Sequence, residues 1–131
     1  MTVQASEIPP ARAPTELVGQ RLGQCRLIRH LSRGGMGDVY DAEHIHLGRR
    51  VAIKIPRLDN HHTWFNQQQL LAEARFLARV AHVNVVAVHD LAYTDEGLTF
   101  LVMEFLDGQP LDRVLVRTPI LDLPQALHLC R

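Results

Sequence analysis

The stretch Val51-Ala52-Ile53-Lys54-Ile55 decides the fold class of this 131-residue chain. Its residues alternate with the period of a β-strand, so the three aliphatic side chains at odd positions are predicted to face a core, while Ala52 and Lys54 face the other side. Pro56 follows and is expected to end the strand. The small residue leaves room for a flat ligand such as a base, and the lysine can reach phosphates attached to that ligand. An edge strand that carries a lysine for solubility is the alternative on these residues alone.

A glycine cluster, Gly34-Gly35-Met36-Gly37, precedes this strand and lies between two further strand-like runs, residues 25–31 and 38–44. The two runs predict a hairpin whose tip holds the cluster. Glycine has no Cβ, so its amides can approach bound phosphate oxygens closely. A glycine-rich tip also occurs where a hairpin needs only a tight turn, and both interpretations stay open on these residues alone.

A helix is predicted for residues 64–80, through which apolar residues recur at helical spacing: Leu70, Ala74, Leu77 and Ala81. Glu73 belongs to the apolar face of this helix, and no cation stands four residues from it in either direction. A carboxylate on a buried face needs a cation from elsewhere. Lys54 is the only lysine of the chain and is therefore the predicted partner. The alternative is that Glu73 lies in water at the edge of the apolar stripe.

Two more strands are predicted after the helix, at residues 85–91 and 98–105, with a turn between them. A short helix is expected at residues 111–116. Another helix is expected to begin at Asp122, where Gln125 three residues later can complete a capping box.

The order of these elements predicts three parts. Residues 1–20 are expected to form a disordered leader, because they hold three prolines and few large apolar residues. Residues 21–106 are predicted to form an α+β domain, a five-stranded antiparallel sheet with one helix inserted after the third strand. Residues 107–131 are expected to hold a hinge and short helices of a second part that is truncated. The last of these helices has an apolar stripe that no later residue of the sequence covers: Leu123, Ala126, Leu127 and Cys130.

Composition argues against several classes of partner. The chain has 14 Lys and Arg residues and 14 Asp and Glu residues, so a net charge of zero gives no electrostatic reason to expect nucleic acid or an anionic membrane. No apolar stretch approaches the ~20 residues of a membrane-spanning helix, and no signal-peptide pattern opens the sequence. Cys25 and Cys130 lie far apart, which indicates reduced thiols in a cytoplasmic protein.

Taken in order, the motifs resemble the protein-kinase signature set. Residues 31–40 resemble the glycine-rich loop, residues 51–54 match the Val-Ala-Ile-Lys strand, and Glu73 stands where the family has the glutamate of its αC helix. Residues 101–108 are similar to the last strand and the hinge. The Arg-Gly-Gly-Met-Gly loop and the Met-Glu-Phe hinge resemble those of bacterial serine/threonine kinases in particular. The resemblance covers about residues 21–131 and implies a kinase N-lobe, followed by the beginning of a C-lobe.

The resemblance also implies an ATP site. Lys54, paired with Glu73, would bind the α- and β-phosphates, and these two residues are the candidate catalytic residues. The loop would cover the phosphates with Ser32, Arg33, Gly34, Gly35, Met36, Gly37 and Asp38. The adenine would lie between Leu31, Val39 and Ala52, with Met103 as gatekeeper, and would bond to the backbone carbonyl of Glu104 and the backbone amide of Leu106. Ser32 replaces the first glycine of the family's loop, and its Cβ is expected to restrict the bend there.

The residues that perform phosphoryl transfer in the family are absent from this sequence, which holds no His-Arg-Asp and no Asp-Phe-Gly motif. Mg²⁺ is therefore expected only together with the missing C-lobe, and a protein substrate only in a complete kinase. An inactive nucleotide-binding module, or one that pairs with another kinase, is the alternative to part of an active enzyme. A metal protein is disfavoured, because neither His44 and His46 nor His61 and His62 have a further ligand at suitable spacing. A dinucleotide-binding fold is also disfavoured, since a strand and not a helix follows Gly37.

Overall fold

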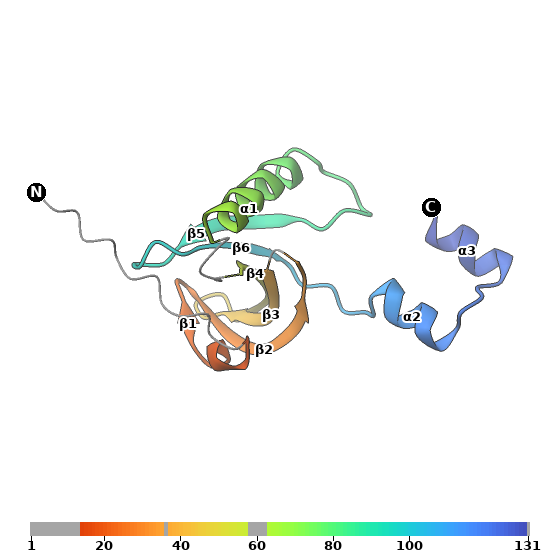
Figure 1. Ribbon diagram of the computed structural model, residues 1–131, viewed down its shortest axis with the longest axis horizontal. Coiled ribbons are helices and arrows are strands. Elements are labelled where there is room, and N and C mark those ends of the chain that lie inside the picture. The colour runs from red at the N-terminus through yellow and green to blue at the C-terminus, as the bar shows by residue number, and fades with distance from the viewer. Residues whose placement is uncertain (1–13, 36, 58–62, 131) are drawn as a thin grey trace, which may run out of the picture.

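The computed structural model describes residues 14–35, 37–57 and 63–130, and its main element is one curled antiparallel sheet (Figure 1). Its strands lie in the order β1-β2-β3-β4-β6-β5. They are β1 (Arg21–Leu22), β2 (Cys25–Arg33), β3 (Gly37–His44), β4 (Arg49–Pro56), β5 (Val88–Tyr93) and β6 (Thr99–Glu104). Strand β4 pairs with β3 on one side and with β6 on the other, so the strand with the lysine lies inside the sheet and not at its edge.

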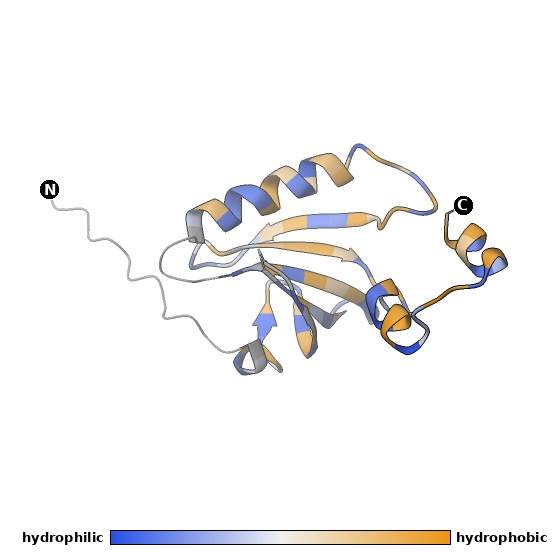
Figure 2. Ribbon diagram, turned by 45° about the vertical axis from the view of Figure 1, so that its right-hand side comes forward, coloured by the Kyte–Doolittle hydropathy of each residue, from blue (hydrophilic) through white to orange (hydrophobic). Residues whose placement is uncertain are grey.

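The helical elements are the 3-10 turn η1 (Pro14–Leu17) and the α-helices α1 (Thr63–Leu77), α2 (Leu111–Arg117) and α3 (Leu123–Leu129). Helix α1 packs on β4, β5 and β6, whereas α2 and α3 follow β6 and extend away from the sheet (Figure 1). Neither α2 nor α3 buries a residue, and Figure 2 shows that both carry hydrophobic residues. The predicted capping box of α3 is present, because Asp122 Oδ1 accepts from the Gln125 amide and Gln125 Oε1 accepts from the Asp122 amide.

The two faces of the sheet carry two separate hydrophobic clusters. The first cluster comprises Leu22, Cys25, Leu27, Tyr40, Ala42, Val51, Ile53, Ile55, Phe100 and Val102. The second cluster lies under α1 and comprises Ala52, Leu70, Ala74, Leu101 and Met103. The alternation predicted for β4 is therefore confirmed, since its odd-numbered aliphatic residues belong to the first cluster and Ala52 belongs to the second. Both faces of β4 are covered from Val51 onward, which explains why Lys54 is the only charged residue in that part of the strand.

The structure contains the five predicted strands and adds one, the two-residue strand β1, which is too short to show a period. Strand β5 begins at Val88, later than the predicted 85–91. The valines at 85 and 86 suggested an earlier start, but the Val85 amide bonds to His82 O in a turn, and Val86 packs on the second cluster as part of a loop. Helix α1 ends at Leu77, before the predicted residue 80, because the amides of Arg79 and Val80 bond three residues back in a tighter turn.

The segment predicted to be a disordered leader, residues 1–20, is ordered at its end. Residues 14–17 form η1, and Leu17 packs against the first cluster. The Gly19 amide and the Gln20 carbonyl bond to the carbonyl and the amide of Leu27 in β2. One apolar contact and two backbone hydrogen bonds thus order the last residues before the sheet, and residues 1–13 lie outside the described part of the chain.

Two phenylalanines provide a direct test of this packing. Phe100 is 1% exposed in the first cluster, while Phe76 is 68% exposed on α1. We expect Phe100→Ala to lower the free energy of unfolding by about 3–5 kcal/mol, because it removes a fully buried ring and leaves a cavity. The matched change Phe76→Ala should cost about 0.5 kcal/mol or less. Urea denaturation followed by circular dichroism measures both, and equal losses would contradict the assignment of the core.

Candidate functional site

Lys54 and Glu73 form an ion pair that joins the sheet to the helix. Lys54 Nζ donates to both carboxylate oxygens of Glu73, at 2.8 Å to Oε1 and 2.6 Å to Oε2. The side chains are 20% and 29% exposed, so the pair is partly desolvated but remains open to solvent. The contact predicted from the sequence is therefore present. It arises because α1 packs on β4 and turns Glu73 toward the face from which Lys54 projects.

Small and aliphatic side chains surround Lys54 on this face. The register pairs Lys54 with Val39 of β3 and with Leu101 of β6, and pairs Ala52 with Met103 of β6. Ala52 and Met103 are 7% and 8% exposed, and Val39 is half-buried at the border of the second cluster. Leu31, at the end of β2, is also half-buried. The structure thus brings Val39, Ala52 and Met103 to the same face as Lys54.

The glycine-rich hairpin is shaped by one close approach to β4. A Cβ on Gly37 would lie 2.3 Å from Ile55 O, a distance that real Cβ atoms do not adopt. Gly37 pairs with Pro56 in the register, so the start of β3 rests directly on the backbone of β4. At Gly35 an added Cβ would meet no atom within 4 Å. Only one of these two glycines is therefore required by contacts within the chain, and Met36, between them, lies outside the described residues.

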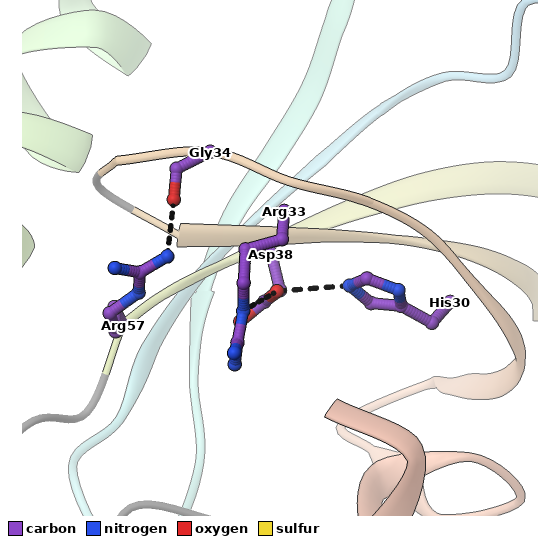
Figure 3. A network of polar contacts seen from close by, with 5 residues as sticks. All are labelled: His30, Arg33, Gly34, Asp38 and Arg57. Atoms are coloured by element: carbon purple, nitrogen blue, oxygen red, sulfur yellow. Dashed lines mark hydrogen bonds and ion pairs between the residues drawn. The ribbon is translucent and has the colours of Figure 1, made fainter. Parts of the chain in front are cut away.

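A buried carboxylate closes the base of this hairpin (Figure 3). Asp38 Oδ1 accepts from Arg33 Nε at 3.0 Å and lies 2.9 Å from His30 Nε2. The His30 ring also packs edge-on against Tyr40, with 5.2 Å between the ring centroids. Since Arg33 and His30 belong to β2 and Asp38 to β3, these contacts tie the two strands together where the loop begins. Arg33 and Asp38 thus contact each other, and their predicted role in covering phosphates stays a prediction.

Arg57 is a residue that the sequence analysis did not identify. Its Nη2 donates to Gly34 O at 2.7 Å, as Figure 3 shows, and its own carbonyl accepts from Asn66 Nδ2 at 3.0 Å. Asn66 is a buried residue near the start of α1. Arg57 therefore links the tip of the hairpin to the helix that carries Glu73. In the sequence, Arg57 is marked only by its position directly after the lysine strand. That position does not indicate which carbonyl its side chain contacts.

Ser32 does not adopt the left-handed backbone conformation. It pairs with Val39 near the end of β2, after a bulge between His30 and Ser32. Among the described residues, positive φ values occur only at glycines, so the Cβ of Ser32 lies in an ordinary conformation. The restriction expected from this side chain stays a prediction.

The last residue of β6, Glu104, is linked to the chain before β5 by two hydrogen bonds. The Glu104 amide donates to Ala87 O at 2.9 Å, and Glu104 Oε2 accepts from the Ala87 amide at 3.2 Å. Leu106 follows outside the strand, and the residue is 63% exposed. The side chain of Glu104 is thus used within the fold. The backbone positions predicted to contact a base lie at the exit from the sheet, next to Met103.

Other kinds of site find no support in the part of the chain that the structure describes. No three His, Cys, Asp or Glu side chains gather there as a metal-binding group, and His61 and His62 lie outside it. No helix in the described ranges combines the length and the apolar character needed to cross a membrane.

Comparison with known proteins gives one consistent result. The protein kinase domain family matches residues 25–130. Serine/threonine-protein kinase Pkn1 of Myxococcus xanthus is 44% identical over 114 residues, which cover 86% of this chain and 16% of that protein. Serine/threonine-protein kinase PknA of Mycobacterium tuberculosis is 40% identical over 111 residues, which cover 82% of this chain and 26% of that protein. The chain thus spans only a minor part of these relatives.

The fold has a counterpart among solved structures. A structure described as the PpkA-294 apo form matches with a TM-score of 0.66 and 23% identity, over 78% of this chain and 42% of that chain. At this identity the match concerns the fold, and it supports the kinase-like N-lobe architecture of the sheet and α1.

The two glycines of the hairpin provide a paired test of its geometry. We expect Gly37→Ala to destabilise the fold by about 1–3 kcal/mol, because its Cβ would overlap Ile55 O and force β3 away from β4. Gly35→Ala should have a much smaller effect, since open space surrounds that position. Thermal unfolding of both variants measures the difference. A loss at position 35 as large as that at position 37 would contradict the close approach.

Proposed function

The chain belongs to the protein kinase domain family, and we propose that it is the ATP-binding part of a serine/threonine-protein kinase, which transfers the γ-phosphate of ATP to hydroxyl groups of proteins. The single observation that carries this proposal is the ion pair between Lys54 and Glu73. In protein kinases a lysine on this strand binds the phosphates, and a glutamate of the neighbouring helix holds it in place. The only lysine of the sequence makes this contact.

The ion pair prepares a cation for phosphate binding. Lysine loses much rotamer freedom when it is fixed, and two hydrogen bonds to Glu73 already impose that cost in the free protein. Glu73 uses two donors of the ammonium group, which leaves a third donor for an oxygen of the ligand. Lys54 is partly exposed, so a phosphate can reach it without displacing the helix. The proposed role of Glu73 is therefore to orient Lys54 and to balance its charge.

The neighbouring side chains suit a flat, apolar ring. Leu31, Val39 and Ala52 are proposed to contact the two faces of the adenine, and Met103 to close the pocket behind it. Ala52 matters because its small side chain leaves space between β4 and the ligand. The backbone carbonyl of Glu104 and the backbone amide of Leu106 are the proposed hydrogen-bonding partners of the base edge. The loop residues from Ser32 to Asp38 are proposed to cover the phosphates.

The transfer step requires groups that these residues do not provide. In the family, two Mg²⁺ ions are held by the aspartate of Asp-Phe-Gly and the asparagine of the catalytic loop, and another aspartate accepts the proton of the attacking hydroxyl. Neither motif occurs in the 131 residues. The described residues also offer no group of three metal-binding side chains. The proposed contribution of this chain is therefore to bind and orient the nucleotide.

A cytoplasmic location remains part of the proposal. Both cysteines are free thiols, and burial raises the pKa of Cys25, which keeps that thiol protonated. Reduced thiols and the use of ATP both fit the cytoplasm. The proposed acceptor is a protein with an accessible serine or threonine.

Removal of Lys54 tests the nucleotide site. We expect Lys54→Met to weaken ATP binding by about tenfold or more, because it removes the cation that contacts the phosphates. Glu73→Gln should weaken binding less, since the lysine remains but is no longer held in one position. Arg75→Met, on the exposed side of α1, is the matched control and should change nothing. Isothermal titration calorimetry measures all three variants. Unchanged affinity of Lys54→Met would refute the site assignment.

A second prediction concerns catalysis by the polypeptide of residues 1–131 alone. It should not phosphorylate a protein, because the groups that hold Mg²⁺ and accept the proton are missing from it. An assay with radiolabelled ATP and a generic basic protein as acceptor measures this, with Lys54→Met as the background control. Incorporation above that control, after contaminating kinases are excluded, would mean that other residues of this chain can perform the transfer.

A further inference from the structure

A buried carboxylate, Asp41 of β3, lies beside the proposed adenine position. Strand alternation places it on the same face of β3 as Val39. The register pairs it with Ala52 of β4, and Ala52 in turn pairs with Met103 of β6. The Asp41 side chain is only 3% exposed. An ionised carboxylate at such a position needs cationic partners, because burial alone would favour its neutral form.

Two arginines supply these partners from the strands on either side. Arg50 of β4 forms a bidentate contact, with Nε at 3.0 Å from Asp41 Oδ1 and Nη2 at 2.7 Å from Oδ2. Arg29 of β2 donates from Nε to Oδ2 at 3.0 Å. The hydrogen bond from Arg50 is the main cause that holds the pKa of Asp41 below its ordinary value, although burial acts in the opposite direction. Asp41 is therefore ionised, and it fixes the plane of the Arg50 guanidinium.

The Arg50 guanidinium also contacts the segment after β6. Its Cζ lies 3.8 Å from the centroid of the Phe105 ring, which is the geometry of a cation–π contact. Phe105 is half-buried at the border of the second cluster. The hydrogen bond with Asp41 raises the pKa of Arg50, and the charge of Asp107, two residues after Phe105, adds to this shift. Arg50 is thus held by β3 and attached to the proposed hinge.

We propose that Arg50, held by Asp41, is a positioning residue for recognition of the adenine base. The inference rests on the proposed function, in which Glu104 and Leu106 present their backbone groups to the base. Phe105 stands between these two residues, so stacking on its ring fixes the peptide groups on both sides of it. Backbone groups that are fixed before the ligand arrives lose less entropy when it binds. Lys54 is four residues farther along β4, roughly 13 Å away, so the effect of Arg50 should concern the base and not the phosphates.

The test uses two probes that divide ATP into its parts, adenosine for the base and tripolyphosphate for the phosphates. Binding of each to the full chain is followed by ¹H–¹⁵N NMR titration, which detects weak affinities and shows at once whether a variant is folded. Arg50→Gln should lower the affinity for adenosine by about three- to tenfold, the range expected for loss of a cation–π contact and its support. It should leave the affinity for tripolyphosphate unchanged. Lys54→Met should show the opposite pattern.

Three further variants distinguish a loss of positioning from a nonspecific effect of the changed charge or of a disturbed fold. Arg49→Gln makes the same charge change one residue earlier, on the opposite face of β4 where Arg49 contacts His89, and should alter neither affinity. Phe105→Leu keeps an apolar side chain but removes the ring, and should reproduce the loss for adenosine. The double variant Arg50→Gln/Phe105→Leu should lose no more than either single variant, because both changes break the same contact. The amide resonance of Leu106 should shift on addition of adenosine to the unaltered chain and shift less in Arg50→Gln.

The outcomes distinguish this inference from the function on which it rests. Unchanged adenosine affinity in Arg50→Gln, or equal losses for adenosine and tripolyphosphate, would overturn the positioning role and leave the nucleotide site intact. If Arg50→Gln does not fold, Phe105→Leu decides the question by the same criteria. Absence of binding of both probes to the unaltered chain would overturn the proposed function itself, and the positioning role with it.

Discussion

The structure depends on the requirement that β4 present two chemically different faces while it is buried on both. Val51, Ile53 and Ile55 fill the first cluster, and Ala52 contributes to the second. Lys54 projects from the face of the strand that α1 covers, and its position is tolerated because Glu73 supplies the opposite charge from that helix. A helix packed without this carboxylate would leave the ammonium group against apolar side chains. The ion pair thus has two roles: it allows α1 to pack on β4, and it is a candidate element of the binding site.

The positively charged side chains of this sequence are arginines with a single exception, Lys54, and the two residue types make different kinds of contact. Thirteen arginines accompany a single lysine. The arginines that contact the sheet and the hairpin each reach a defined acceptor: Arg29 and Arg50 bond to Asp41, Arg33 to Asp38, and Arg57 to the carbonyl of Gly34. The planar guanidinium presents its donors in fixed directions, which suits permanent contacts within the fold. The ammonium group of lysine is compact and its donors rotate, so it can adapt to an oxygen of a bound ligand. Loss of Lys54 should therefore remove a direct contact to the ligand, whereas loss of one of these arginines should act through the segments that it holds in place, as proposed for Arg50.

Local patterns in the sequence were sufficient to predict the strands, the helix and the contact between Lys54 and Glu73. Alternation identified β4, helical spacing identified α1, and the unpaired carboxylate of Glu73 implied its partner. The contacts of Asp41 and Arg57 could not be predicted in this way, because they depend on register and on how far the hairpin bends over β4. The bulge between Leu27 and Arg29 shifts the pairing of β2 by one residue. Without knowledge of that bulge, the sequence does not show which arginine meets Asp41.

The link from Asn66 through Arg57 to Gly34 has a mechanical consequence. The helix end, the strand end and the hairpin tip are joined by two hydrogen bonds in series, at 3.0 Å and 2.7 Å. Hydrogen bonds of this length tolerate little stretching, so a displacement of α1 away from the sheet either pulls the hairpin with it or breaks one of the two bonds. The Lys54 contact would lengthen in the same movement, because Glu73 is carried by the same helix. Movements of the hairpin and of the helix are therefore expected to be coupled through Arg57.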